Sequence, residues 1–214
     1  SGGAWHFNGI TTDATYDPAA SDPGVYIYVV AGTGACHADS ASVNVTESVA
    51  LSAGRDTVIA LCSNAAAFDL ITLLPDAAAG GAWTVNGGPH GNSYDPQTDA
   101  SGDLVYTVTS PTPCPADQAT VSINQVSAPN AGDPGTTDIC ANGDPIDLFS
   151  ILNGSPDTGG QWTDGNGAGI DASFNPALDQ GGTFTYTVIG NAPCSNASAP
   201  ITVKIPVRMT PGTM

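Results

Sequence analysis

Five cysteines are the residues of this 214-residue chain whose spacing most directly predicts chemistry. The sequence numbers of Cys62 and Cys114 differ by 52, and those of Cys140 and Cys194 differ by 54 (114 − 62 and 194 − 140). Two successive pairs of similar span indicate disulfides and an oxidising compartment. We therefore predict Cys62–Cys114 and Cys140–Cys194 bonds, each of which should stabilise its module by about 4 kcal/mol because it closes a long loop. Cys36 has no partner in this scheme, so we expect it to be unpaired or intermolecular.

Metal binding is a weaker interpretation of the charged residues. Zinc ligation is disfavoured because the chain has no Cys-x-x-Cys and its three histidines are scattered. Calcium takes roughly six to eight oxygen ligands, more than any aspartate cluster offers, and Asp-Pro or Asp-Gly pairs are ordinary turn residues. We predict no cofactor, with calcium as a weak alternative. The clusters are Asp95, Asp99 and Asp103; Asp17 and Asp22; and Asp164, Asn166 and Asp171.

Enzymatic motifs are not evident. The sequence contains no Gly-x-Ser-x-Gly, no phosphate loop and no His-Glu-x-x-His. Paired carboxylates could hydrolyse a glycoside, but these aspartates recur along the chain as turn residues, which a single active site has no need to do. We predict no catalytic residues and no enzyme.

A threefold repeat supplies the elements that position the cysteines. Trp5, Trp83 and Trp162 each follow Gly-Gly-x, and their sequence numbers differ by 78 and 79 (83 − 5 and 162 − 83). A strand tyrosine and a cysteine follow each tryptophan at similar intervals. Self-similarity at a fixed period indicates tandem modules, and a period near 80 suits a small β-domain. We expect each tryptophan to anchor a core, and each glycine pair to allow a sharp turn or a close backbone approach.

Apolar residues alternate in phase in all three copies, which predicts half-buried strands and an all-β fold. The inward positions of the central strand are Tyr26, Tyr28 and Val30; Leu104, Tyr106 and Val108; and Phe184, Tyr186 and Val188. Those of the last strand are Val43 and Val45; Val121 and Ile123; and Ile201 and Val203.

The repeat divides the chain into modules with a period of 78 to 80. Residues 1–46 are a partial module that holds only the second half of the pattern. The middle module (47–124) and the last module (125–203) are complete, and the short Pro-bearing joint between them predicts a rod. Residues 204–214 form a tail, which we interpret as the first strand of a further module or as a donor strand.

Composition limits the partners. With 20 acidic and 3 basic residues the net charge is −17, which argues against binding to nucleic acid or to anionic membrane surfaces. No apolar run approaches the roughly 18 residues of a membrane span, so we predict no membrane insertion. The sequence that begins at Ser1 shows no signal-peptide pattern, and we therefore expect a processed or excerpted protein.

The incomplete ends admit two interpretations. The chain is an excerpt of a longer repeat protein, or subunits exchange strands head to tail and form a fibre. The partial module's central strand is also apolar on its outer face, and exposed apolar patches mark interfaces, although β-propensity alone could explain them. The candidate interface comprises Val25, Ile27, Val29, Ile205, Val207 and Met209.

The repeat resembles the Ig-like tandem repeats of large secreted Bacteroidetes surface proteins, including gliding-motility adhesins. Its motifs are Gly-Gly-x-Trp, Tyr-Thr-Val, Leu61-Cys62-Ser63-Asn64, Cys140-Ala141-Asn142-Gly143, Tyr94-Asp95-Pro96 with Phe174-Asn175-Pro176, and Pro193-Cys194. The resemblance implies immunoglobulin-like β-sandwich modules, export and glycosylation. Candidate acceptors are Ser40 and Thr57 for O-linked sugar and Asn44, Asn153 and Asn196 for N-linked sugar.

The leading functional hypothesis is therefore a structural or adhesive subunit of an extracellular cell-surface filament, assembled head to tail with itself. The alternative is a carbohydrate-binding accessory module of a secreted enzyme. A small hydrolase is the third hypothesis, and it would need a pocket with convergent aspartates.

Overall fold

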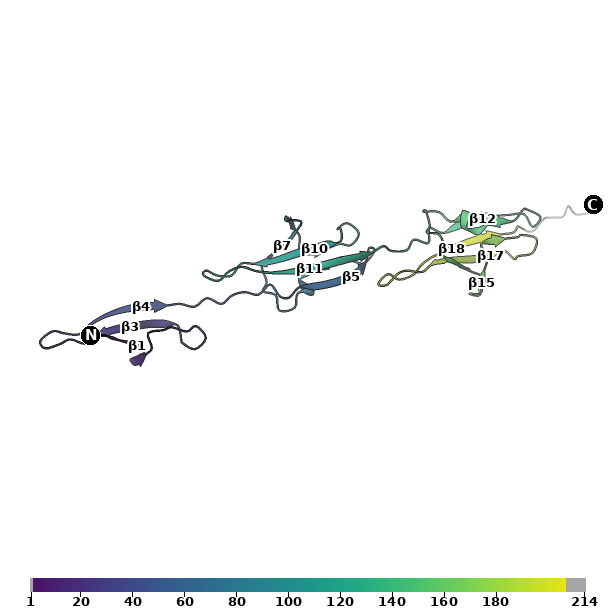
Figure 1. The fold of residues 1–214 in the computed structure, drawn as a ribbon. Helices are drawn as coiled ribbons and strands as arrows, with labels where there is room; N and C mark the ends of the chain where they lie inside the picture. The colour runs from purple at the N-terminus through teal and green to yellow at the C-terminus, as the bar shows by residue number, and fades with distance from the viewer. Residues whose placement is uncertain (1, 207–214) are drawn as a thin grey trace, which may run out of the picture.

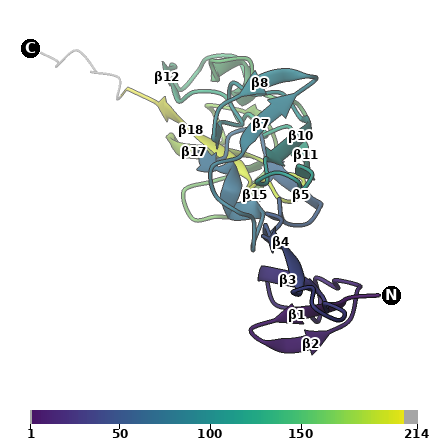
Figure 2. The same cartoon turned by 90° about the vertical axis from the view of Figure 1, so that its left-hand side faces the viewer.

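The computed structural model describes residues 2–206, and it arranges three β-modules in a row, with the chain ends at opposite ends of the row (Figure 1). Seen along the row, the middle and last modules overlap, whereas the partial module lies to one side of them (Figure 2). The partial module is one antiparallel sheet of order β2-β1-β3-β4. Its strands are β1 (Ala4–Phe7), β2 (Ile10–Thr12), β3 (Gly24–Val30) and β4 (Asp39–Val45).

The middle module has a five-stranded sheet of order β5-β11-β10-β7-β8, covered by a second layer. That layer consists of a two-stranded sheet, β6 with β9, and a 3-10 turn. The elements in chain order are β5 (Thr57–Cys62), β6 (Phe68–Asp69), η1 (Leu70–Leu73), β7 (Ala82–Val85), β8 (Gly88–His90), β9 (Ser93–Tyr94), β10 (Gly102–Val108) and β11 (Asp117–Val126).

The last module repeats this plan, with a sheet of order β12-β18-β17-β14-β15 and a second layer of β13, β16 and η2. Its elements are β12 (Gly135–Asp138), β13 (Ile146–Asp147), η2 (Leu148–Ile151), β14 (Gln161–Thr163), β15 (Gly169–Ile170), β16 (Ser173–Phe174), β17 (Gly182–Val188) and β18 (Ala197–Lys204).

Each complete module encloses its own core between the two layers. The alternating residues predicted to face inward are buried: Leu104 and Tyr106 on β10, and Val121 and Ile123 on β11, are all at most 3% exposed. Leu70 and its neighbours in the second layer close the core from above, and the last module has an equivalent cluster. The fold is thus all-β and consists of tandem immunoglobulin-like β-sandwich modules, as the alternation and the resemblance predict.

The first and last strands of each complete module pair in parallel, so the two ends of a module differ. The opening strand β5 runs parallel to the closing strand β11, with Thr57 opposite Val121 and Cys62 opposite Val126. In the last module β12 is likewise parallel to β18. The remaining strand pairs of the three modules are antiparallel. Each complete module therefore ends its first strand and its last strand at the same end, and in the middle module this end lies next to the last module.

The Gly-Gly-x-Trp motif is explained by close contact with the strand tyrosine. Gly81 donates its backbone N–H to the hydroxyl of Tyr106 at 2.9 Å, and a Cβ at this position would lie 2.5 Å from the Tyr106 ring. Gly80 has a φ of +87°, which places it in the left-handed region that favours glycine. Gly3 and Gly160 make the same bond to Tyr28 and Tyr186. The first glycine turns the chain and the second permits the approach.

We predict that Gly81→Ala destabilises the middle module by about 1–3 kcal/mol, because the added methyl group overlaps the Tyr106 ring and the neighbouring backbone. The matched control is Gly91→Ala, since Gly91 has open space around its Cβ position and should change the free energy of unfolding by less than about 0.5 kcal/mol. Denaturant unfolding of the full chain measures both. Equal effects of the two substitutions would contradict the steric explanation.

Candidate functional site: the joints between modules

A disulfide crosses the joint between the two complete modules. Cys62, at the end of β5, is bonded to Cys194, in the loop between β17 and β18, with a Cα–Cα distance of 4.9 Å. The predicted Cys62–Cys114 and Cys140–Cys194 pairs are therefore wrong. The remaining three cysteines are free: Cys36 and Cys140 are exposed, and Cys114 is half-buried.

Strand direction explains why the predicted pairs do not form. Because β5 is parallel to β11, Cys62 lies opposite Val126, at the end of β11, whereas Cys114 lies in the loop before its start at Asp117. A ten-residue strand spans about 30 Å, and a disulfide needs Cα atoms within about 7 Å. Cys140 and Cys194 are separated in the same way, because they lie near opposite ends of β18.

Backbone contacts accompany the disulfide at this joint. The Cys194 sulfur lies 3.3 Å from the carbonyl oxygen of Val126, the residue opposite Cys62. Ser63 donates its N–H to the same carbonyl at 2.9 Å, and its hydroxyl accepts the N–H of Ala128 at 3.0 Å. The loop of the last module thus reaches back onto the closing strand of the middle module, and the two are held together covalently.

The joint between the partial and middle modules has the same construction without the disulfide. The Cys114 thiol donates to the carbonyl oxygen of Ser48 at 3.2 Å. Ser48 donates its hydroxyl to Thr112, and Leu51 donates its N–H to the Ser110 hydroxyl. Ser48 corresponds in the repeat to Val126, because their sequence numbers differ by the repeat period (126 − 48 = 78). Cys114 therefore occupies the position of Cys194, but no described residue supplies its bonding partner.

The partial module leaves its core face uncovered. Val43 on β4 is 49% exposed, whereas its counterparts Val121 and Ile201 are 0% exposed. A hollow of about 110 Å³ opens beside it, lined in part by Trp5, Tyr16 and Val45. In the complete modules the opening strand extends the sheet at this edge, and the second layer with its 3-10 turn covers the face. The partial module contains neither among its described residues.

The outer face of β3 is exposed as well. Val25 is 52% and Ile27 is 40% exposed, and Val29 is half-buried. Of the other predicted interface residues, Ile205 packs against the core of the last module, and Val207 and Met209 lie outside the described residues.

Tyr16 fastens the turn of the partial module to the end of β4. Its hydroxyl donates to the Glu47 carboxylate, and this hydrogen bond, with desolvation as the next cause, raises the pKa of Tyr16 to about 12. The middle module has an equivalent hydrogen bond with an uncharged amide in place of the carboxylate, because Gln125 donates to the Tyr94 hydroxyl at 2.8 Å. Glu47 and Gln125 are equivalent positions of the repeat (125 − 47 = 78).

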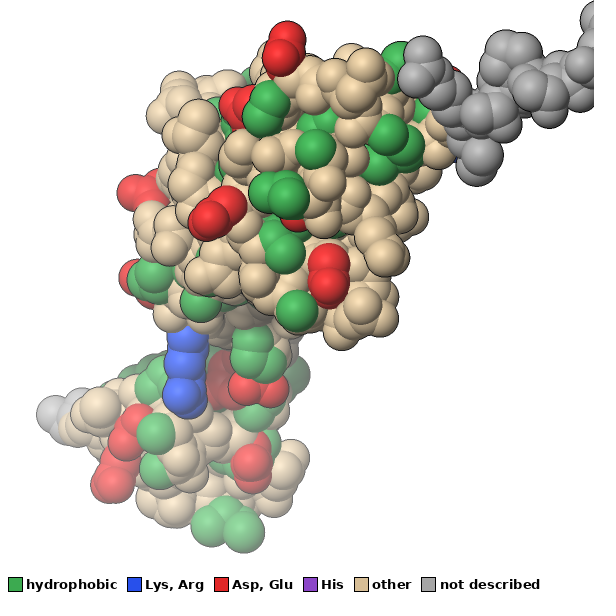
Figure 3. Space-filling view, turned by 90° about the vertical axis from the view of Figure 1, so that its right-hand side faces the viewer, with side chains coloured by type: hydrophobic (Ala, Val, Ile, Leu, Met, Phe, Trp, Pro, Cys, Tyr) green, Lys and Arg blue, Asp and Glu red, His purple; other side chains and the backbone are tan. Residues whose placement is uncertain are grey.

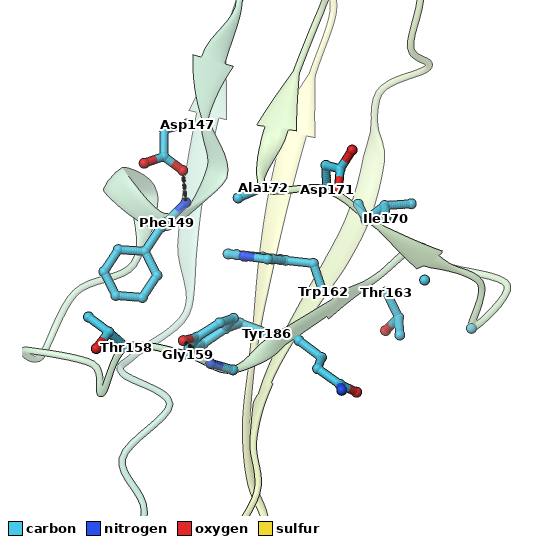
Figure 4. A pocket seen from close by; sticks show the side chains of 14 residues that line it. Asp147, Phe149, Thr158, Gly159, Trp162, Thr163, Ile170, Asp171, Ala172 and Tyr186 are labelled. Carbon is cyan, nitrogen blue, oxygen red and sulfur yellow. Dashed lines mark hydrogen bonds between the residues drawn. The ribbon is translucent and has the colours of Figure 1, made fainter.

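A shallow groove lies beside the tryptophan of each complete module. In the last module it measures about 950 Å³ and is bounded by η2 on one side and β14 on the other (Figure 4). Asp147 and Asp171 line it, but the Asp147 carboxylate accepts the N–H of Phe149 at 3.0 Å. Trp162 is 6% exposed, so its ring face is buried in the core and offers no platform on which a sugar could stack.

Three of the clustered aspartates, Asp95, Asp99 and Asp164, hold turns. Asp95 accepts the N–H of Gln97, and Asp99 accepts that of Asp95. Asp164 accepts the N–H groups of Ala168 and Asn166, and these bonds lower its pKa. Within residues 2–206, no group of three or more histidine, cysteine or acidic residues is arranged to hold a metal ion.

The candidate sugar acceptors lie at the surface of all three modules. Ser40 and Asn44 are exposed on β4, and Thr57 is half-buried at the start of β5. Asn153 and Asn196 are exposed, and the Asn196 side-chain oxygen accepts the N–H of Gly190. Seen from the C-terminal end, acidic side chains are scattered over the surface and basic ones are few (Figure 3). In the described part of the chain, no helix could cross a lipid bilayer.

Comparisons with known proteins agree on the architecture. The chain is similar to the I-band fragment I67–I69 from titin, with a TM-score of 0.51 and 9% identity over 96% of this chain and 88% of that one. An E-to-A variant of the same three titin Ig domains gives the same values. Sidekick-1 immunoglobulin domains 1–5 align with a TM-score of 0.38, 14% identity and coverage of 96% and 52%. No protein-family model and no curated protein sequence matches the chain. At 9% identity the similarity to the titin fragments establishes the fold alone, a row of Ig-like domains.

Peptide mapping under non-reducing conditions should recover Cys62 joined to Cys194, with Cys36, Cys114 and Cys140 as free thiols. Because this bond closes a 132-residue loop, Cys194→Ser should lower the free energy of unfolding by about 2–5 kcal/mol. The matched control is Cys36→Ser, which should be neutral in the monomer. Recovery of a Cys62–Cys114 peptide would contradict the strand arrangement described above.

The Tyr16–Glu47 contact should make stability depend on alkaline pH. The folded protein holds the Tyr16 proton more tightly than the unfolded chain, whose tyrosine pKa is about 10. The contact's contribution is therefore complete below pH 10 and is lost as pH rises towards about 12. Tyrosine absorbance should show late titration of Tyr16 and also of Tyr94, whose pKa is raised by burial, and Glu47→Gln should move only the Tyr16 titration towards the ordinary value. An unchanged titration in this variant would show that Glu47 is not the cause.

Proposed function

We propose that the chain is a structural, adhesive repeat subunit of an extracellular cell-surface fibre, similar to the Ig-like repeats of Bacteroidetes gliding-motility adhesins, and that copies assemble head to tail. The observation that carries the proposal is the disulfide across the joint of two consecutive modules. A covalent bond between neighbouring domains resists extension and bending, which is the mechanical task of a fibre, and it requires an oxidising environment.

The two cysteine positions that form this disulfide recur in the partial module and the last module, where the cysteines are free. Cys140 corresponds to Cys62, because each lies at the end of the opening strand of its module and their sequence numbers differ by the repeat period (140 − 62 = 78). Cys36 corresponds to Cys194, because each lies in the loop before the closing strand. Both are exposed, and they lie in the two outermost modules of the row (Figure 1).

Cys140 at one end of the chain and Cys36 at the other are the two halves of such a joint. A contact between two different ends is heterologous, and because it repeats without closing it builds a fibre. In such a fibre Cys140 of one copy bonds Cys36 of the next, in the geometry of Cys62 and Cys194. Bond formation transfers two electrons and two protons from the two thiols to an oxidising disulfide such as oxidised glutathione, which leaves as two thiols.

The remaining properties of the chain support the same role. The acidic surface keeps long assemblies soluble, and only three basic residues expose few sites to trypsin-like proteases. Sugars on Ser40, Thr57, Asn44, Asn153 and Asn196 would cover exposed strands and loops of all three modules. No bound cofactor is needed for this function, and the chain itself is the partner.

The test is covalent assembly of the full chain in a glutathione redox buffer, followed on non-reducing gels and by electron microscopy. We expect a ladder of multimers and beaded fibres from the native chain, and monomers from Cys36→Ser or Cys140→Ser alone. A mixture of these two variants retains one Cys36 and one Cys140 on different chains, so it should stop at the dimer. Cys114→Ser is the matched control and should still give the full ladder.

Two outcomes would overturn the proposal. One is a chain that stays monomeric while its Cys62–Cys194 bond forms, and the other is a ladder that survives both substitutions. Specific retention of the monomer on a glycan array would instead favour a carbohydrate-binding module.

A further inference from the structure

The open edge of β4 and the unpartnered thiol of Cys114 point to one occupant. We infer that the partial module binds a module-opening peptide segment, which adds a parallel strand to β4, covers the exposed core face and forms a disulfide with Cys114. The inference rests on the repeat geometry and is independent of the fibre proposed above. The chemistry of the occupant is defined by residues 53–79 and 131–158, which perform this task in the two complete modules.

The sheet edge sets the direction and register of the bound strand. In the middle module Thr57 lies opposite Val121 and Cys62 opposite Val126. Subtracting the repeat period of 78 places the bound strand opposite Val43 to Ser48 of the partial module. The cysteine that ends this strand then lies opposite Ser48. Ser48 is the residue whose carbonyl already accepts the Cys114 thiol at 3.2 Å.

The Cys114 thiol is therefore placed in the same way as Cys194 is placed in the Cys62–Cys194 disulfide. The Cys194 sulfur lies 3.3 Å from the carbonyl of Val126, opposite its partner Cys62. The Cys114 sulfur lies at nearly the same distance from the equivalent carbonyl, and it is half-buried in the joint. Cys114 therefore has the surroundings of a cysteine in a disulfide between modules, but it has no second cysteine to bond among the described residues.

The apolar face provides the second, separate reason for an occupant. Val43 is 49% exposed where the complete modules have 0%. In the middle module the face is covered by Leu61 of the opening strand and by Leu70 and Leu74 of the 3-10 segment, each at most 9% exposed. The last module uses Leu148 and Leu152 in the same way. The occupant is thus a strand with alternating apolar residues, then a cysteine, then a leucine-rich turn about eight residues later.

The bond between the occupant and Cys114 can form by thiol–disulfide exchange, which needs no separate oxidant when the occupant's cysteine is already part of a mixed disulfide. If the occupant's cysteine carries a thionitrobenzoate group, the Cys114 thiolate attacks the occupant's sulfur. A new sulfur–sulfur bond forms, the bond to the aromatic thiol breaks, and thionitrobenzoate leaves with the electron pair. Its absorbance reports the rate, and Cys114 loses one proton to solvent.

The experiment uses the full chain and two synthetic peptides of residues 53–79, which contain Cys62 as their single cysteine. One peptide is native and the other carries Ile59→Asp, Leu61→Asp and Leu70→Asp, and both bear thionitrobenzoate on Cys62. Docking raises the effective concentration of the two sulfurs, so the native peptide should modify Cys114 at least about tenfold faster than the substituted one. Cys36 and Cys140 should react equally with both peptides.

Peptide mapping assigns the modified cysteine, and hydrogen exchange should show new protection along β4 with the native peptide only. The full chain with Val43→Asp should lose the rate difference at Cys114, while its Cys36 and Cys140 keep their rates. Equal modification of Cys114 by the two peptides would overturn the inference, as would a rate gain confined to the exposed Cys36 and Cys140. Because fibre assembly uses Cys36 and Cys140, failure here and failure of the fibre test are distinguishable.

Discussion

The parallel pairing between the first and last strands of each complete module governs most of this structure. Because β5 and β11 run in the same direction, the opening strand delivers Cys62 to the end at which the chain leaves the module. An antiparallel opening strand would instead end beside the loop that carries Cys114. Strand direction alone therefore turns a disulfide that would stabilise one module into a bond that joins two, and it gives the row of modules a head and a tail.

Mechanical continuity follows from the same arrangement. The joint between complete modules combines a covalent bond with hydrogen bonds from Ser63 to Val126 and from Ala128 to Ser63. The preceding joint uses Ser48, Ser110 and the Cys114 thiol, and it relies on neutral hydrogen bonds that contribute about 1 kcal/mol each. Under force along the row, the joint between the partial and middle modules should therefore open first. A disulfide at Cys114 would strengthen it.

Local sequence patterns were sufficient to predict the modules. Alternation at period two identified the buried faces of β10 and β11, because a side chain on a strand faces the core at every second residue whatever the neighbouring strand is. The Gly-Gly-x-Trp motif was explained by contact with a tyrosine about 25 residues away, which recurs in phase. The exposed outer face of β3, with Val25 and Ile27, was also visible in the alternation.

The cysteine pairing was not predictable from spacing, since spacing gives the length of a loop and contains no information about which end of a sheet each cysteine reaches. Both the predicted and the observed pairs use one strand-end cysteine and one loop cysteine, so the repeat pattern fits either. A signal was nevertheless present in the sequence. The second half of the pattern occurs three times and its opening half twice, so loop cysteines outnumber strand-end cysteines by one.

That inequality has a physical meaning once the strand direction is known. Pairing within modules leaves Cys36 as the single odd thiol, whereas pairing between successive modules leaves one strand-end thiol, Cys140, and two loop thiols, Cys36 and Cys114. The first scheme describes self-contained domains that happen to be linked. The second describes modules that enclose their own cores but share a disulfide with a neighbour, and in it the exposed core face of β4 and the free thiol of Cys114 both lie where the next joint has an opening strand.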